Sequence, residues 1–278
     1  MAATGSVDRD GFALDFVRQG SGIPMLILGP PRYYQRVFPV DLGSTFDIVF
    51  ANLRLFVPAP PAFDVSTLSR ATYSDDIEAV RRAAGLVRPV VVGHSITGLL
   101  ALEYARRHPE STRGVVVIAA PPAGVAELSE HWGSFFEQDA GADRRAAHAR
   151  NVVTRGMPTS IRTGQDIVDQ YVANGAFYWF DPTFDATPLW EGVEPRYPAF
   201  LQLNGDLYGH YQLEPVEVPV FLALGRYDYA VPYLLWDDER KKRIGRLHYE
   251  LYERSGHTPP YEEPQRFAAD LIAWAESL

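Results

Sequence analysis

Short runs of apolar residues that alternate with helical patterns constrain the fold of this 278-residue chain more than any other feature. The runs PMLILG (24–29), PVVVG (89–93) and RGVVVIAAPP (113–122) carry apolar side chains at consecutive positions. Such a strand needs cover on both of its faces, which is typical of parallel sheets. The segments 74–85 and 95–108 lie between these runs and carry apolar residues at helical spacing. We therefore expect an α/β fold, with a mostly parallel sheet covered by helices.

A stretch in the middle of the chain breaks this alternation. From residue 123 to residue 214, strand-like runs are few and aromatic residues are many, which favours a mainly helical cap inserted into the sheet domain. The core domain is then predicted at 1–122 and 215–278, with the cap at 123–214. Further strands are expected at 12–17, 46–53, 218–225 and 246–252, and further helices at 232–243 and 263–278.

The balance of charge and the absence of cysteine exclude several classes of function. The chain has 26 Lys and Arg residues against 35 Asp and Glu residues, a formal net charge of −9, which would repel nucleic acid and anionic lipid. No cysteine is present, which removes disulfides, thiolate nucleophiles and most zinc sites. The first residues show no basic stretch followed by an apolar run. We expect a cytoplasmic protein whose partner is a small-molecule substrate, without a metal, nucleic-acid or membrane partner; a homodimer is an open alternative.

Ser95 stands where the valine run VVVG ends and a helical pattern begins. This places it on a tight turn at the carboxyl end of a central strand, the edge at which open α/β sheets bind ligands. A turn of this kind lifts a serine hydroxyl clear of the backbone. Two phosphate-binding patterns fail here, because Ser95 occupies the second glycine position of a dinucleotide loop and Gly98 is followed by Leu99 rather than by lysine. The pattern favours a nucleophilic serine.

A nucleophilic serine needs a base, and the base needs an acid that orients it. Asp228 follows the strand predicted at 218–225, and His257 follows the strand predicted at 246–252 in a loop rich in Gly and Pro. Their order after the serine matches the order that this arrangement uses. Asp206 and His248 are rival residues, but the first lies in the predicted cap and the second lies within a strand.

The motifs GHSITG, LGRYDYAVP and SGHTPPYEEP resemble those of the α/β-hydrolase superfamily, and the resemblance covers nearly the whole chain. The chain is most similar to the proline iminopeptidase-like branch, whose members are mostly serine peptidases and esterases with a helical cap. The resemblance implies that Ser95 is the nucleophile, that His257 is the general base and acid, and that Asp228 holds the tautomer of His257. It also implies that no cofactor is needed.

Two positions depart from the family pattern. Thr97 stands where the turn around the serine usually has glycine, which is tolerable if its φ stays negative. One oxyanion donor should be the N–H of Ile96, but the loop that normally supplies the second donor reads LGPPRYY, and proline has no N–H. Three possibilities are open: a hydroxyl of Tyr33 or Tyr34 replaces the amide, the loop shifts so that the N–H of Arg32 points inward, or the second donor is absent. We favour a tyrosine hydroxyl ahead of Arg32.

A further residue matches the family only in part. Arg54 corresponds to the arginine of a D-x-R-G segment, but the acid and the glycine beside it are missing. We interpret Arg54 as structural.

The leading reading is a serine hydrolase that cleaves a small carboxylic ester with an apolar or aromatic part through an acyl-enzyme. The aromatic cap and the residue before the nucleophile supply the predicted substrate-binding residues, which are His94, Trp132, Tyr178 and Trp179. Two alternatives stay open. An aminopeptidase would need a cap carboxylate for the substrate ammonium, for which Glu130, Glu137, Glu191, Glu194 and Glu214 are available. A non-hydrolytic member of the fold, either a cofactor-free oxygenase or lyase or a ligand receptor, would explain the prolines in the donor loop.

Overall fold

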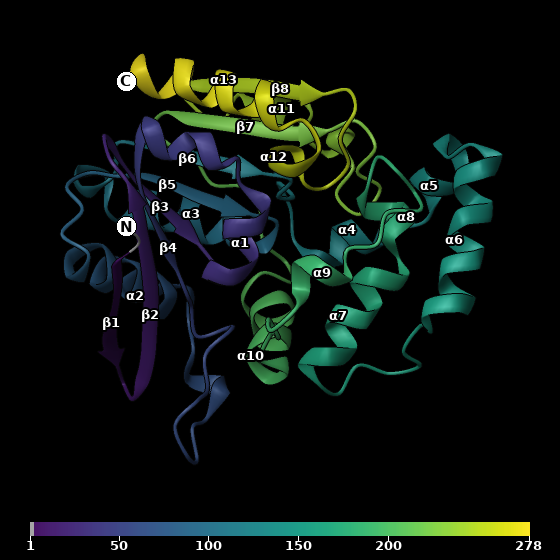
Figure 1. The fold of residues 1–278 in the computed structure, drawn as a ribbon, viewed down its shortest axis with the longest axis horizontal. Helices are drawn as coiled ribbons and strands as arrows, with labels where there is room; N and C mark the ends of the chain where they lie inside the picture. The colour runs from purple at the N-terminus through teal and green to yellow at the C-terminus, as the bar shows by residue number, and fades with distance from the viewer. Residues whose placement is uncertain (1–2) are drawn as a thin grey trace.

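An eight-stranded sheet forms the centre of the computed structural model, which describes residues 3–278 apart from the side chain of Glu130. The order of the strands across the sheet is β1-β2-β4-β3-β5-β6-β7-β8 (Figure 1). β1 and β2 pair antiparallel with each other, β2 also pairs antiparallel with β4, and the other pairs are parallel. The prediction of a mostly parallel α/β sheet is confirmed. The strands are β1 (Ala3–Arg9), β2 (Phe12–Gly20), β3 (Ile23–Leu28), β4 (Phe46–Ala51), β5 (Val90–His94), β6 (Gly114–Ile118), β7 (Val220–Gly225) and β8 (Leu247–Tyr252).

Helices cover both faces of this sheet, because the valine strands point side chains to either side. Val91 and Val117 belong to the cluster that packs against α2 (Arg70–Ala83) and α3 (Ile96–Arg107). Val92 belongs to the opposite cluster, which contains residues of α1 (Pro31–Val37) and α13 (Pro264–Glu276). All of these side chains bury apolar area on a face of the sheet, which is the main favourable term in the stability of the core.

The segment between β6 and β7 contains helices and turns but no named strand among the described residues. In Figure 1 the arrowheads of β7 and β8 point toward this helical part, so it lies at the carboxyl ends of the strands. Its last portion is not separate from the core, since Leu203, Tyr208 and Tyr211 pack in the same cluster as α3. The helices are α4 (Val125–His131), α5 (Ser134–Asp139), α6 (Ala142–Arg155), α7 (Gly164–Ala173), α8 (Gly175–Tyr178), α9 (Thr187–Trp190) and α10 (Tyr197–Gln202), and two further short helices, α11 (Asp238–Lys241) and α12 (Pro259–Glu262), flank β8.

Two elements were not expected from the sequence. The donor loop after β3 continues directly into α1, which begins with Pro31 at its first position, where the missing N–H leaves no bond unmade. β1 is an edge strand whose residues are exposed or half-buried, so it lacks the apolar alternation that identifies a strand in a sequence.

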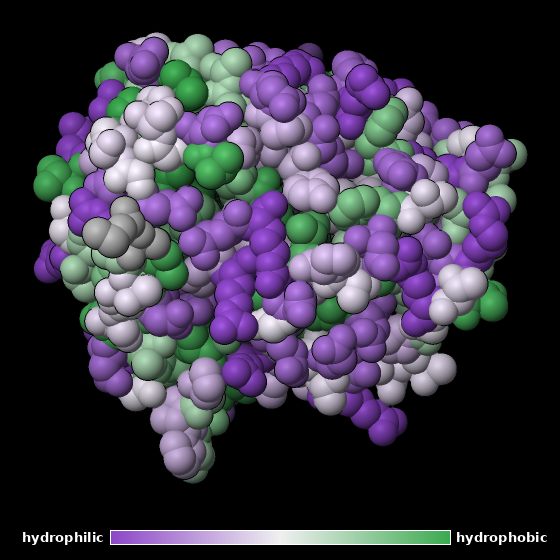
Figure 2. Space-filling model, viewed as in Figure 1, coloured by the Kyte–Doolittle hydropathy of each residue, from purple (hydrophilic) through white to green (hydrophobic). Residues whose placement is uncertain are grey.

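The surface mixes polar and apolar residues. Figure 2 shows hydrophilic residues spread over the face drawn, with apolar residues scattered between them. Across the described residues, the helices are all too short or too polar to cross a membrane.

Arg54 links the loop after β4 to α2 through a buried ion pair. Its Nε and Nη2 atoms donate to the two carboxylate oxygens of Asp76 at 2.5 and 2.9 Å, and Nη2 also donates to Asp10 at 2.7 Å. The side chains of Arg54 and Asp76 are 1% and 0% exposed. This bidentate contact supports the structural interpretation of Arg54.

Arg54→Ala should lower the free energy of unfolding by about 3–5 kcal/mol, because it leaves the carboxylate of Asp76 buried and deprived of its bidentate partner. Urea unfolding of the variant and of the unmodified protein measures the difference. Lys242→Ala, which removes an exposed pair with Glu239, is the matched control and should change it by at most about 1 kcal/mol. Equal losses in the two variants would contradict the structural role.

Candidate active site

Ser95 occupies a strained turn between β5 and α3. Its φ is +55° with ψ at −131°, a region that residues other than glycine rarely adopt. Its N–H donates to the carbonyl of Ile118 on β6 at 2.8 Å. The turn is tight enough that a Cβ at Gly93 would lie 2.2 Å from the carbonyl oxygen of Thr97, and one at Gly98 would lie 2.6 Å from Cβ of Ala120. The glycines are therefore required by the approach of β5, α3 and the end of β6.

Thr97, the departure from the usual glycine, is built into the turn. It lies in α3 and is not among the residues with positive φ. Its hydroxyl accepts the N–H of His94 at 2.9 Å and lies 3.2 Å from the carbonyl oxygen of Leu28, at the end of β3. The hydroxyl therefore links the serine turn to the strand that leads into α1.

Asp228 and His257 meet as the sequence order predicts. Asp228 follows β7 and is 1% exposed, and its Oδ1 accepts the N–H groups of Ala230 and Val231 at 3.0 and 2.8 Å. Its Oδ2 lies 2.7 Å from Nδ1 of His257, which follows β8. A carboxylate can only accept, so Nδ1 of His257 donates and Nε2 is left with its lone pair.

The rival residues lie elsewhere. His248 is on β8, stacks on Phe221 and pairs with Glu250 at 3.2 Å. Asp206 is exposed in the segment after α10. Neither lies against Ser95 in the cavity that holds it.

Ser95 and His257 line one cavity of about 90 Å³ between the carboxyl edge of the sheet and the helical segment. Its walls carry no Asp, Glu, Lys or Arg side chain among the residues that the structure describes, and in the same described range no three His, Asp or Glu side chains are placed to hold a metal ion. The remaining lining residues are Pro30, Tyr33, Tyr34, Phe56, His94, Ile96, Thr97, Tyr171, Tyr178, Trp179, Ala186, Trp190, Pro195, Phe200 and Thr258.

Three of the predicted substrate-binding residues, His94, Tyr178 and Trp179, are in this lining. Trp132 is not: it is 43% exposed, and its ring lies 5.7 Å from that of Phe177. The sequence analysis did not single out two other lining residues, Phe56 and Trp190. Phe56 could have been found, because it lies shortly after the carboxyl end of β4.

The loop after β3 offers few N–H groups to a developing oxyanion. Gly29 donates to Ala51, and the N–H groups of Tyr33 and Tyr34 both lie against the carbonyl of Pro30. Arg32 belongs to a neighbouring groove, where its guanidinium lies against Gly192. Ile96 is the first residue of α3, where the helix does not use the N–H.

Tyr33 and Tyr34, which follow this loop in α1, line the cavity and are the hydroxyl candidates for the second oxyanion donor. The Tyr34 hydroxyl lies 3.4 Å from Nδ1 of His94, and both tyrosines line the cavity together with Thr97 and Thr258. Burial raises the pKa of both phenols well above the usual value. Both hydroxyls therefore keep their protons at neutral pH.

The imidazole of His94 is neutral and lies beside His257. Its Nε2 lies 2.8 Å from the carbonyl oxygen of His257, which can only accept, so Nε2 carries the proton. Burial, together with the neighbouring His257 ring, lowers the pKa of His94 to about 3. An uncharged ring here adds no positive charge against His257 when the latter is protonated.

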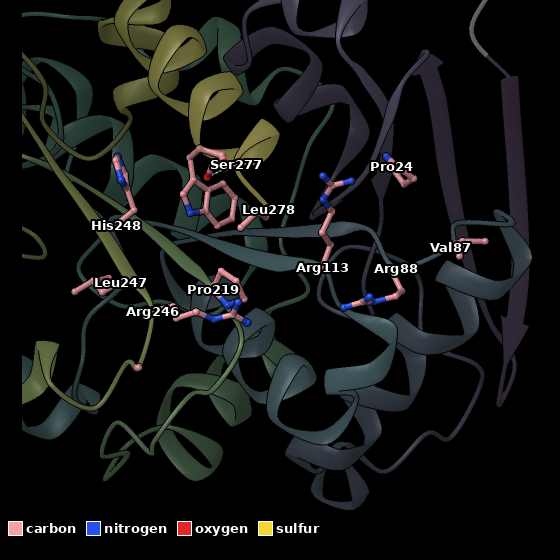
Figure 3. A pocket seen from close by; sticks show the side chains of 12 residues that line it. Pro24, Val87, Arg88, Arg113, Pro219, Arg246, Leu247, His248, Ser277 and Leu278 are labelled. Carbon is pink, nitrogen blue, oxygen red and sulfur yellow. Dashed lines mark hydrogen bonds between the residues drawn. The ribbon is translucent and has the colours of Figure 1, made fainter.

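A second hollow lies at the opposite edge of the sheet, where Arg88, Arg113 and Arg246 precede β5, β6 and β8 (Figure 3). The Arg113 guanidinium donates to the carbonyl of Ala275 in the last turn of α13 at 3.2 Å. Cations are favourable at the carboxyl end of a helix. We interpret this hollow as structural.

Comparison with known proteins gives a family match over most of the chain. Residues 19–270 match the model described as the alpha/beta hydrolase family. A Bacillus subtilis protein described as AB hydrolase superfamily protein YclE is 29% identical over 99% of this chain and 100% of its own length. The pimeloyl-[acyl-carrier protein] methyl ester esterase of Vibrio atlanticus is 24% identical over 84% of this chain and 88% of its own.

Solved structures share the fold. The proline iminopeptidase of Mycobacterium smegmatis superposes with a TM-score of 0.73 and 18% identity over 99% of this chain and 98% of its own. A thermophilic esterase from Thermogutta terrifontis gives 0.70 and 17% over 100% and 98%. At these identities the likeness extends to the fold alone.

The His94 ring should remain neutral, with the proton on Nε2, until the pH falls to about 3. Because its folded pKa lies below the unfolded value of 6.5, the unfolded chain binds the extra proton, and the stability contributed by neutral His94 is lost as the pH falls through this window. Nitrogen NMR of the imidazole reports the tautomer and the midpoint. A midpoint near the unfolded value, or a proton on Nδ1, would contradict this arrangement; His94→Gln should flatten the dependence of the unfolding free energy on pH.

Proposed function

This chain belongs to the alpha/beta hydrolase family, and from that premise we propose that it is a serine hydrolase that cleaves small carboxylic esters with an apolar or aromatic part. The observation that carries the proposal is the hydrogen-bonded pair of Asp228 and His257 at a cavity that also contains Ser95 and no charged wall. A nucleophile, a base and an orienting acid are the parts that acyl transfer requires.

In the proposed reaction, Nε2 of His257 takes the Ser95 proton while the serine oxygen attacks the ester carbonyl. His257 then gives this proton to the departing alkoxide, which leaves as the alcohol, and an acyl-enzyme remains on Ser95. Water repeats the two proton transfers and releases the acid. Asp228 keeps Nδ1 protonated throughout and stabilises the imidazolium that forms on His257.

The oxyanion of the tetrahedral intermediate is assigned to the N–H of Ile96 and to a tyrosine hydroxyl. The prolines at 30 and 31 have no N–H, and the amides of Gly29, Tyr33 and Tyr34 already have backbone acceptors. The hydroxyls of Tyr33 and Tyr34 stay protonated and belong to the wall of the cavity. The N–H of Arg32, the second residue of α1, has no backbone acceptor among the described residues and is the remaining amide candidate. We favour a tyrosine hydroxyl as the second donor, ahead of this N–H.

The uncharged cavity wall favours an ester substrate over a peptide substrate with a free amino terminus. An aminopeptidase must pair the substrate ammonium with a carboxylate, because a buried charge without a partner is strongly unfavourable. Glu191 and Glu194 line the neighbouring groove instead, and Glu214 lies beside Arg70 and Arg106. Glu137 is not in the described cavity wall, and the side chain of Glu130 lies outside the described part.

The size of the cavity favours a small acyl or alcohol group. A cavity needs a volume of roughly 10–15 Å³ to hold one water molecule. The volume of about 90 Å³ beside Ser95 therefore admits a group of several heavy atoms. Aromatic walls suit an apolar or aromatic group. Two of the compared proteins are themselves named as esterases.

Treatment with a fluorophosphonate probe should label the protein on Ser95, and Ser95→Ala should abolish both labelling and turnover of short acyl p-nitrophenyl esters. Turnover should fall by about 10⁴-fold or more in Ser95→Ala and by about 10⁴-fold in Asp228→Asn. Amino-acyl anilides, assayed in parallel, should be poor substrates.

Ser129→Ala, at an exposed serine of α4, is the control and should behave as the unmodified protein. Absence of any labelling would refute the serine hydrolase and favour the non-hydrolytic alternative. Anilide turnover above ester turnover would favour the aminopeptidase.

Removing both phenol hydroxyls with Tyr33→Phe and Tyr34→Phe together should lower kcat by about a hundred- to a thousand-fold, the usual effect of losing one oxyanion donor. The two single variants then identify which hydroxyl donates. Tyr249→Phe, on β8, is the matched control. Full turnover in the double variant would refute the tyrosine donor.

A further inference from the structure

Glu262 ends α12, five residues after His257, and its side chain turns back onto the loop that holds this histidine. Its Oε2 accepts the N–H groups of Gly256 and Thr258 at 2.9 and 3.2 Å. These are the residues on either side of His257. One carboxylate oxygen therefore holds the backbone both before and after the general base.

The other oxygen of Glu262 reaches the helical segment. Oε1 accepts the N–H of Phe180 at 2.6 Å, and the N–H of His257 itself donates to the carbonyl of Tyr178 at 2.6 Å. The Tyr178 ring also lies edge-on to the His257 imidazole, with ring centroids 5.3 Å apart. We call residues 178–180 the latch segment.

The loop that holds His257 and the latch segment approach each other closely at Gly256. A Cβ at Gly256 would lie 2.2 Å from the carbonyl oxygen of Tyr178 and 3.0 Å from Cα of Trp179. The buried Arg144 of α6 also donates to the carbonyls of Trp179 and Phe180 at 2.7 and 2.5 Å. Gly256 thus permits a backbone contact with a segment that both Glu262 and Arg144 hold.

The Glu262 carboxylate accepts three backbone N–H groups. This arrangement requires the ionised form of Glu262, because protonation would place an O–H where an N–H already points. Loss of water around the carboxyl, together with the nearby charge of Asp228, raises the pKa of Glu262 to about 7. The other groups that face it are the Arg144 guanidinium and the Tyr33 phenol. The carboxylate and its contacts are therefore complete above neutral pH and weaken as the pH falls below it.

We infer that Glu262 is a positioning residue, which fixes the backbone of His257 against the latch segment and so aims the imidazole at Ser95. This inference rests on the proposed serine hydrolase function. Tyr178 and Trp179 also form part of the cavity wall. The contacts of Glu262 therefore fix the position of the general base relative to this part of the wall.

The test compares Glu262→Gln with Glu263→Gln in steady-state ester hydrolysis. Glutamine keeps the shape but places an NH₂ group against backbone donors. We expect kcat to fall by about ten- to a hundred-fold and KM to change by a smaller factor, because Glu262 fixes the backbone of the general base directly and the cavity wall only through the latch segment. Glu263 accepts from Arg254 and Ser255 but from neither neighbour of His257, and its variant should stay within about threefold of the unmodified protein. Equal kcat in the two variants would overturn the inference.

The pH profile separates positioning from simple stabilisation. In the unmodified protein kcat/KM should lose a component as the pH falls through about 7, where Glu262 becomes protonated, and this component should be absent in Glu262→Gln. Identical acid limbs in Glu262→Gln and Glu263→Gln would overturn the inference.

Amide hydrogen exchange gives a readout that needs no turnover. The amides of Gly256, Thr258 and Phe180 should exchange faster in Glu262→Gln than in Glu263→Gln. If the unmodified protein hydrolyses no ester, the proposed function fails; unchanged exchange at these three amides is the separate result that overturns the role of Glu262.

Discussion

The backbone turn at Ser95 is the constraint on which the rest of the site depends. A residue other than glycine in this conformation is strained by about 1–3 kcal/mol, so it persists only where its surroundings leave no alternative. Those surroundings are the glycines at 93 and 98, the bond from Ser95 to Ile118, and the hydroxyl of Thr97, which ties the turn to β3. The turn places Ser95 in the cavity at the edge of the sheet to which β7 and β8 bring Asp228 and His257.

The helical segment supports the candidate site as well as covering it. The loops that carry Asp228 and His257 both bond to it, through Tyr229 to the carbonyl of Phe177 and through His257 to the carbonyl of Tyr178. The same short stretch supplies Tyr178 and Trp179 to the cavity wall. A change that displaces this stretch therefore alters the base and the substrate site together, which couples the proposed chemistry to the proposed specificity.

Sequence reasoning reaches the fold and brings together Asp228 and His257, because valine runs mark buried strands and functional side chains follow their carboxyl ends. It does not reach contacts that have no local pattern. Phe180 and Glu262 are 82 positions apart, and no sequence pattern near either residue predicts the hydrogen bond between them. Trp132 and Trp190 both lie in the aromatic-rich segment, yet of these two only Trp190 lines the cavity, while Trp132 is 43% exposed.

The central claim is that Ser95, His257 and Asp228 act as one unit through an acyl-enzyme. The most direct measurement is the intact mass of the protein after rapid acid quenching during turnover of a p-nitrophenyl ester, followed by mapping of the modified peptide. The account predicts a mass increase of one acyl group, located on Ser95, which accumulates because the good p-nitrophenolate leaving group makes acylation faster than deacylation. Ester turnover without an acyl group on Ser95, or with the acyl group on another residue, would contradict it.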